Sequence, residues 1–110
     1  MAKMPKEKPD NENILTQGRQ QLQAGQFQGA GESASAVLLT QPNHPDALYL
    51  LAVSQRYLQD VDGALQSLAL LKTQDPTLGR AHQESGHCYL ALNRQKDALA
   101  AFQQAVQLNN

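Results

Sequence analysis

The strongest constraint on the fold is a period of 34 residues. Small residues recur at this step in two series, Gly18, Ala52, Gly86 and Ala30, Ala64, Ala98. A period of this length is typical of repeat proteins, in which each unit buries its apolar face only against its neighbours. The sequence therefore predicts one domain of three stacked units, after a flexible N-terminal tail. The expected boundaries are 1–10 for the tail and 11–44, 45–78 and 79–110 for the units.

Each unit is expected to hold two amphipathic helices. In the middle unit, Pro45 suits the first turn of a helix, and apolar residues follow at helical spacing. Asp60 is a suitable N-cap for the second helix of this unit. Gly25 and Asn93, at the matching turns of the other units, tolerate the left-handed conformation that ends a helix. The pattern predicts helices over residues 12–24, 27–40, 45–58, 61–74, 79–92 and 95–108.

The third unit carries the most complete motif. Its small residue Gly86 is followed by Tyr89, Ala98, Phe102 and Ala105. The order and spacing of these residues resemble the tetratricopeptide repeat, and the resemblance covers residues 11–110. It implies an all-α fold, a right-handed α-solenoid of three helix-turn-helix repeats with six helices. It also implies a protein–protein interaction module without catalytic activity.

The chain departs from the repeat pattern at several positions. His82 stands where the family often has Trp, and Gln17 stands where Leu is usual. Gln21 and Gln55 replace the Tyr that the third unit keeps. These polar residues are expected to weaken the core of the first unit most.

A second resemblance concerns residues 18–25 and 44–53. These runs are similar to the N-terminal repeats of bacterial proteins in which such a stack precedes a sulfotransferase domain. The resemblance leaves open that the chain is a docking or regulatory domain of a longer enzyme. A transferase domain would need a phosphate-binding loop, and this sequence has none.

Charge and hydropathy exclude several function classes. A net charge of −1 argues against nucleic-acid binding, which needs a basic excess or stripe. No apolar run approaches the ~18 residues of a membrane span. The first ten residues lack the apolar stretch of a signal peptide, and the single cysteine, Cys88, excludes an internal disulfide. A cytoplasmic location is expected.

No catalytic residue, cofactor or metal site is predicted. His82, His87 and Cys88 are metal-ligating residue types, but at ~100° per residue their side chains diverge around one helix. The serines lie within helical patterns, and no nucleophile–base pair can be nominated. The acidic residues fit solvated charges or helix caps better than a general acid/base pair.

The predicted function depends on the first helix of each unit, because these helices line the concave face of a curved stack. Carried over through the resemblance, the candidate partner-binding residues are Arg19, Tyr49, Val53, Arg56, Tyr57, Arg80, Gln83 and His87. Tyr and Arg dominate binding hot spots. The sequence therefore predicts a groove, centred on the middle unit, that binds a segment of an unknown protein or peptide. The alternative is that Tyr49 and Tyr57 only cover the neighbouring helix.

One family function can be compared with the sequence directly. Some three-repeat domains of this family clamp the C-terminal carboxylate of heat-shock chaperones with five Lys, Asn and Arg residues. The matching positions here are Leu15, Arg19, Leu50, Arg80 and Glu84. Only two of them are basic, and Glu84 would repel a carboxylate. A chaperone co-factor role is therefore not expected.

The last predicted helix raises the question of self-association. The family usually adds a polar-faced helix after the final repeat. Here the stripe that includes Leu99, Phe102 and Val106 is expected to be only partly covered, and uncovered repeats tend to associate. The sequence predicts either association through this helix or a place within a longer protein. A purely structural spacer is a further alternative.

Overall fold

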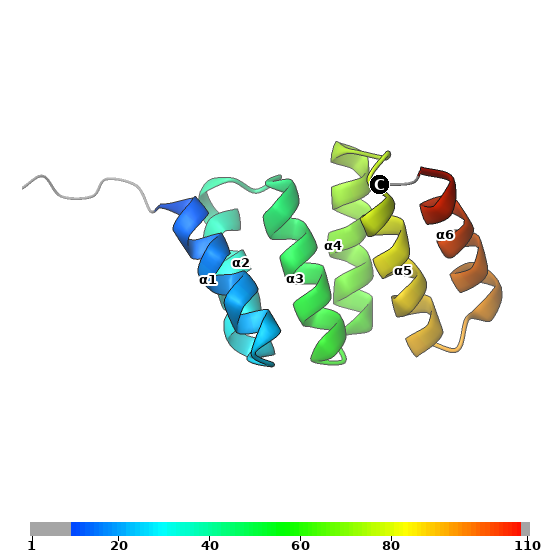
Figure 1. Ribbon diagram of the computed structural model, residues 1–110, viewed down its shortest axis with the longest axis horizontal. Coiled ribbons are helices and arrows are strands. Elements are labelled where there is room, and N and C mark those ends of the chain that lie inside the picture. The colour runs from blue at the N-terminus through cyan, green and yellow to red at the C-terminus, as the bar shows by residue number, and fades with distance from the viewer. Residues whose placement is uncertain (1–9, 109–110) are drawn as a thin grey trace, which may run out of the picture.

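The computed structural model describes residues 10–108, which form a row of six helices (Figure 1). Their bounds are α1 Asn11–Gln23, α2 Phe27–Thr40, α3 Pro45–Tyr57, α4 Val61–Gln74, α5 Gly79–Ala91 and α6 Gln95–Leu108. Each bound agrees with the predicted helix to within one residue, and the all-α repeat fold is confirmed. Residues 1–9 of the predicted tail and residues 109–110 lie outside the described residues.

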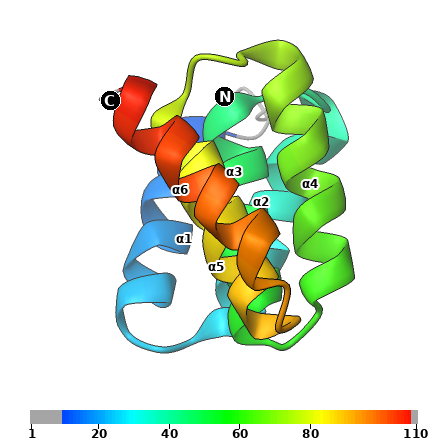
Figure 2. The ribbon, with the colours of Figure 1, turned by 90° about the vertical axis from the view of Figure 1, so that its right-hand side faces the viewer.

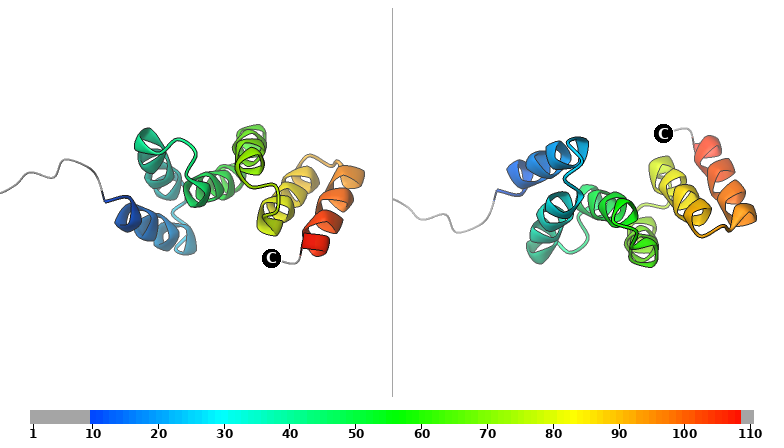
Figure 3. Two further views of the ribbon diagram at one scale, coloured as in Figure 1. Left: turned by 90° about the horizontal axis from the view of Figure 1, so that it is seen from above. Right: turned by 90° about the horizontal axis from the view of Figure 1, so that it is seen from below.

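The helices pack in sequence order, with α1·α2, α3·α4 and α5·α6 as pairs that α2·α3 and α4·α5 contacts join. The first helices of the pairs also contact one another, α1 with α3 and α3 with α5. Among the described helices, no Cα atom of α2 lies within 8 Å of a Cα atom of α4. The views along the vertical axis show α2 and α4 on one side of the row, with α3 between them (Figure 3). The first helices therefore form one continuous face.

Local sequence sets the helix ends as predicted at most positions. The Asp60 carboxylate accepts a hydrogen bond from Gly63 N at 3.1 Å, so it caps α4. Asp10, which the sequence placed in the tail, caps α1 in the same way by accepting from Asn13 N. Gly25 has a φ of 80° and Asn93 a φ of 60°, which confirms their left-handed conformation.

The core consists of two clusters that follow each other along the stack. Their buried members are Leu15, Ala30, Ala34, Val37, Ala47 and Leu50 in the first, and Leu48, Ala52, Ala64, Leu68, Leu71, Ala81 and Cys88 in the second. The repeated small residues permit this packing. A Cβ at Gly18 would lie 2.6 Å from Leu50 Cδ2, and one at Gly86 would lie 2.5 Å from Phe102 Cε1. Larger side chains at these positions would push the helices apart.

The polar departures from the repeat pattern are paired within the fold. Ser33 Oγ donates to Gln21 Oε1 at 2.7 Å, and Ser67 Oγ donates to Gln55 Oε1 at 2.8 Å. These two pairs are related by the 34-residue step. In the third unit the equivalent residues are Tyr89 and an alanine. Glutamine thus comes with a serine partner, which removes the cost of an unpaired polar group.

Candidate interaction face

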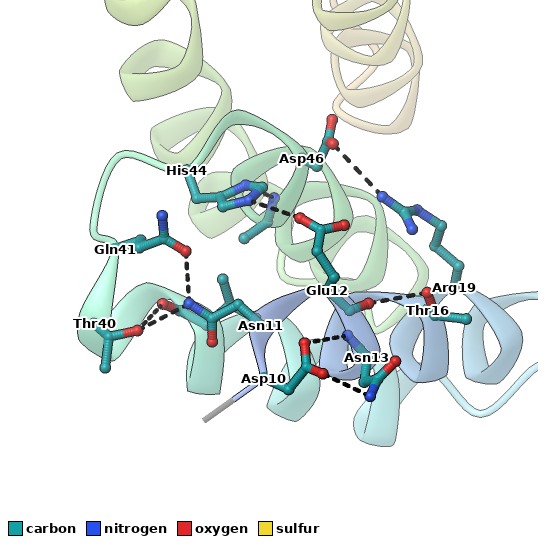
Figure 4. A network of polar contacts seen from close by, with 12 residues as sticks. Asp10, Asn11, Glu12, Asn13, Thr16, Arg19, Thr40, Gln41, His44 and Asp46 are labelled. Carbon is teal, nitrogen blue, oxygen red and sulfur yellow. Dashed lines mark hydrogen bonds and ion pairs between the residues drawn. The ribbon is translucent and has the colours of Figure 1, made fainter. Parts of the chain in front are cut away.

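At one end of the face formed by the first helices, Asp46 of α3 binds an arginine from the first helix of each neighbouring repeat. Arg19 Nη2 of α1 lies 3.6 Å from Asp46 Oδ2 (Figure 4), and Arg80 Nη2 of α5 donates to Asp46 Oδ1 at 2.6 Å. The Arg80 guanidinium also lies over the Tyr49 ring, 4.8 Å from its centroid. Burial and the nearby Glu84 carboxylate raise the pKa of the Tyr49 hydroxyl. This group of side chains links all three repeats, and both arginines have a carboxylate partner.

Nearer the other end of α3, Arg56 binds Glu84 of α5. Arg56 Nε donates to Glu84 Oε2, and Arg56 Nη2 donates to Oε1 at 3.3 Å. The Glu84 side chain is only 5% exposed. A carboxylate removed from water in this way needs its partner, because breaking a buried pair leaves an uncompensated charge. Arg56 therefore stabilises the junction between the second and third repeats.

Tyr57 lies at the end of α3 between two other groups. Its ring stacks on Phe27, with 4.5 Å between centroids and 6° between planes. The Arg56 guanidinium carbon lies 4.6 Å from the Tyr57 centroid. Tyr57 is still 49% exposed. A partly exposed aromatic ring held in place by its neighbours is well suited to bind a partner, because little side-chain entropy remains to be lost.

A hollow of about 670 Å³ opens beside Arg56 and Tyr57. Its lining residues are Arg56, Tyr57, Gln59, Asp60, Val61, Asp62, Ala91 and Leu92. The 34-residue register explains it. Val61 corresponds to Phe27, and Ala91 corresponds to Tyr57. The stacked ring pair at the first junction is thus replaced at the second by two small side chains, which leave the space open.

The other predicted residues have different environments. Val53 is only 6% exposed, so its side chain belongs to the packed interior. His87 makes an edge contact with Phe102 of α6, at 5.2 Å between ring centroids. Gln83 is exposed on α5. The structure thus groups Arg19, Tyr49 and Arg80 around Asp46 and places Arg56 and Tyr57 beside the hollow. Val53, Gln83 and His87 belong to neither group.

Sequence reasoning missed the residues that shape the hollow. Val61, Ala91 and Leu92 line the hollow but lie outside the first-helix positions that the resemblance assigns to the groove. The signal was present in the register, where an aromatic residue changes to a small one at two matching positions. Reading the repeat for departures in size, as well as for agreement, would have found it.

A second hollow, of about 470 Å³, lies between α2 and α3. Its lining includes Gly31, Ser35, Leu39, Leu51 and Leu58. The 34-residue step places Leu65 of α4 at the position of Gly31, so the missing side chain of Gly31 contributes to this opening. None of the predicted partner-binding residues lines this second hollow.

The metal-ligating residue types are dispersed. Within residues 10–108, no three His, Cys, Asp or Glu side chains are grouped closely enough to hold a metal ion. His82 Nε2 lies 3.1 Å from the Pro76 carbonyl oxygen. Cys88 is buried, and burial, followed by the negative charge of Glu84, raises the pKa of its thiol to about 11. In the same part of the chain, no helix is long and apolar enough to cross a membrane.

In the comparisons with known proteins, one family model matches the middle repeat, and the similar structures share the fold. Residues 46–77 match the family model of the tetratricopeptide repeat. No curated protein matches the sequence. The structure of MamA AMB-1 is similar, with a TM-score of 0.81 and 21% identity over 91% of this chain. This chain spans only 59% of that MamA chain.

Two further structures have the same fold. The Yersinia enterocolitica type III secretion translocator chaperone SycD has a TM-score of 0.86 and 17% identity, over 94% of this chain and 80% of SycD. The first tetratricopeptide-repeat domain of Spaghetti (RPAP3), bound to the HSP90 peptide SRMEEVD, has a TM-score of 0.83 and 15% identity. That match covers 89% of this chain and 78% of the other. At such identities the likeness concerns the fold.

Proposed function

We propose that the chain, whose middle repeat matches the tetratricopeptide-repeat family model, is a protein-interaction module that binds a partner segment beside that repeat. No catalytic activity is proposed for the chain. The repeat family and the fold of the similar structures support the general function. The observation that carries the specific proposal is the hollow beside Tyr57 and Arg56.

The shape of the hollow indicates what it binds. At the first junction, the equivalent space is filled by the Phe27 and Tyr57 rings. A large apolar or aromatic side chain of a partner can therefore enter the second junction and contact Val61 and Ala91. Asp60 and Asp62 lie on its lining. These carboxylates favour a Lys or Arg next to that side chain in the partner.

The chaperone-tail mode of the Spaghetti domain is not proposed for this chain. The peptide in that structure, SRMEEVD, carries several carboxylates. Here Arg19 and Arg80 are both paired with Asp46, while Leu50 and Glu84 are buried. The residues at the matching positions offer little free positive charge to an acidic tail, so an apolar segment with basic neighbours fits this face better.

A random-peptide display library, selected on the immobilised chain, tests the proposal. Enriched peptides are expected to combine a large apolar or aromatic residue with Lys or Arg. The selected peptide is then measured by fluorescence anisotropy against the wild type and against Val61→Phe with Ala91→Tyr, which copies the first junction. We expect at least a tenfold loss of affinity, since the filled hollow excludes the anchor.

Two controls separate binding from folding. Tyr89→Ala removes a tyrosine of α5 that is not among the residues lining the hollow and should leave peptide affinity unchanged. Helical circular dichroism should be the same in all variants. Peptide binding that is unaffected by filling the hollow would place the site elsewhere.

Other proposals make different predictions. A docking or regulatory role within a longer, sulfotransferase-type enzyme rests on the resemblance of residues 18–25 and 44–53 alone. A structural spacer would yield no enriched peptide and would tolerate filling of the hollow. A cytoplasmic location fits the sequence features described above. Self-association through Leu99, Phe102 and Val106 has a specific observation in its favour, because Leu99 and Val106 are 59% and 77% exposed.

A further inference from the structure

The two ends of the stack present opposite chemistry. At the last helix, Leu99 and Val106 occupy the positions that Leu65 and Lys72 hold in α4. Leu65 packs against the second core cluster, and Lys72 donates to Ser85 of α5. The face that α4 turns toward α5 is therefore repeated on α6. Figure 2 shows α6 at the front of the row, with none of the other described helices over it.

The first helix has the reverse character. The α3 positions that pack against the preceding repeat are Ala47, Leu50, Leu51 and Ser54, and three of these are buried. The matching residues of α1 are Asn13, Thr16, Gln17 and Gln20, and all four are exposed. An α1 helix docked on the α6 face of another copy would remove these polar groups from water without matching partners. The polar face of α1 thus disfavours head-to-tail association of two copies.

We infer that the α6 face binds the α6 face of a second copy, with the two helices antiparallel about a two-fold axis. This inference rests on the self-association proposed above and specifies its geometry, while it is independent of the hollow beside Tyr57. Leu99 and Val106 are seven residues apart, so they lie on one side of α6. An axis midway between them brings Leu99 of each copy against Val106 of the partner subunit, and both contacts form at once.

The charge pattern of α6 supports a symmetric contact. In a two-fold interface the same patch meets itself, so any charge near the axis would meet an identical charge. Residues 98–108 contain no Asp, Glu, Lys or Arg. The charged residues Arg94, Lys96 and Asp97 lie at the start of the helix and face the uncharged last turn of the other copy. The uncharged stretch thus coincides with the exposed apolar residues.

The size of the contact sets its strength. One face of a single helix buries less than the ~800 Å² per partner of a standard stable interface. The dimer is therefore weak, with a dissociation constant in the micromolar range, and its population depends on protein concentration.

Sedimentation equilibrium of the 110-residue chain across the micromolar range tests the inference. The wild type should move from monomer to dimer. Leu99→Lys combined with Val106→Lys should be monomeric, because like charges then face each other. Leu99→Lys combined with Val106→Glu should dimerise, since each lysine then meets a glutamate of the second copy. Leu39→Lys changes another exposed leucine, 85% exposed on α2, and should leave the dimer intact.

Three outcomes would overturn the inference. They are a wild type that stays monomeric, equal behaviour of the two charged double variants, and dissociation by Leu39→Lys. All substituted residues are exposed, so circular dichroism should show an unchanged fold. The selected peptide should still bind the monomeric double variant, which distinguishes failure of the dimer from failure of the proposed peptide-binding function.

Discussion

The two junctions between repeats share one backbone arrangement but differ in what fills them. Between the first and second repeats, the Phe27 and Tyr57 rings stack. Between the second and third, Val61 and Ala91 take these places, and the hollow opens beside them. The α2 and α3 helices also pack together more extensively than α4 and α5. The stacked rings fill this part of the first junction, whose own hollow lies elsewhere between α2 and α3, while the second junction keeps an open space beside Arg56 and Tyr57.

The second junction also depends more on polar groups. Leu38, which contacts both core clusters, corresponds to Lys72. Lys72 Nζ donates to Ser85 Oγ at 2.6 Å, and burial lowers the pKa of Lys72. The Arg56–Glu84 pair crosses the same junction. A polar, less filled junction has fewer apolar contacts to lose when it opens, so we expect it to be the more mobile of the two.

The largest expected effect is on the ion pair of the second junction. Arg56→Ala leaves the Glu84 carboxylate buried without a partner and should lower the free energy of unfolding by about 3 kcal/mol. Urea denaturation measures the loss. Arg94→Ala provides the control, because the Arg94–Asp97 pair is about half exposed and contributes little. Equal losses in the two variants would mean that Glu84 does not depend on Arg56.

A smaller loss is expected at the aromatic contact of the first junction. Phe27→Ala removes the ring that stacks on Tyr57, and because Phe27 is only partly buried the cost should be about 2 kcal/mol. Val61→Ala, at the equivalent position, should cost less than half as much. Thermal unfolding of both variants compares them. A larger loss at Val61 would reverse the assignment of the better packed junction.

A gain is expected where the second junction is made to resemble the first. Lys72→Leu copies Leu38 and should raise the free energy of unfolding by about 1 kcal/mol at pH 7. The folded pKa of Lys72 is lowered, so its charged form penalises folding below that pKa, and the penalty disappears as pH rises toward 10.5. The advantage of the leucine variant should therefore shrink between pH 7 and pH 10. Urea denaturation at several pH values follows this difference, and a constant advantage would count against the charge as its cause.

The smallest effect concerns the turn beside the hollow. Gln59 has a φ of 68°, at the position that Gly25 holds in the first turn. A left-handed conformation is unfavourable for a residue with a Cβ, so Gln59→Gly should stabilise the fold by roughly 0.5 kcal/mol. Differential scanning calorimetry measures the shift in melting temperature. Gln66→Gly, on an exposed part of α4, should instead destabilise the protein.

Repetition made much of the fold predictable. The recurrence of Gly18 and Ala30 at a fixed step indicated where helices meet, and turn residues such as Gly25 and Asp60 indicated where helices begin and end. These are local or periodic properties, which a sequence carries directly. The candidate site was predicted less completely. Arg56 and Tyr57 lie beside the hollow, but Val53 is buried.

The sequence by itself determined the number of helices, their bounds and the small residues that let them pack. Only the tertiary structure decided which side chains across a junction become partners. Asp46 binds Arg19 and Arg80, and Glu84 binds Arg56. The two residues of each pair lie in successive repeats, far apart in the sequence. Such pairs depend on the rotation between successive repeats and on the rotamers of long side chains. Neither the rotation nor the rotamers follow from the period. The period therefore located the face of the first helices but did not determine which of its charged side chains pair with one another.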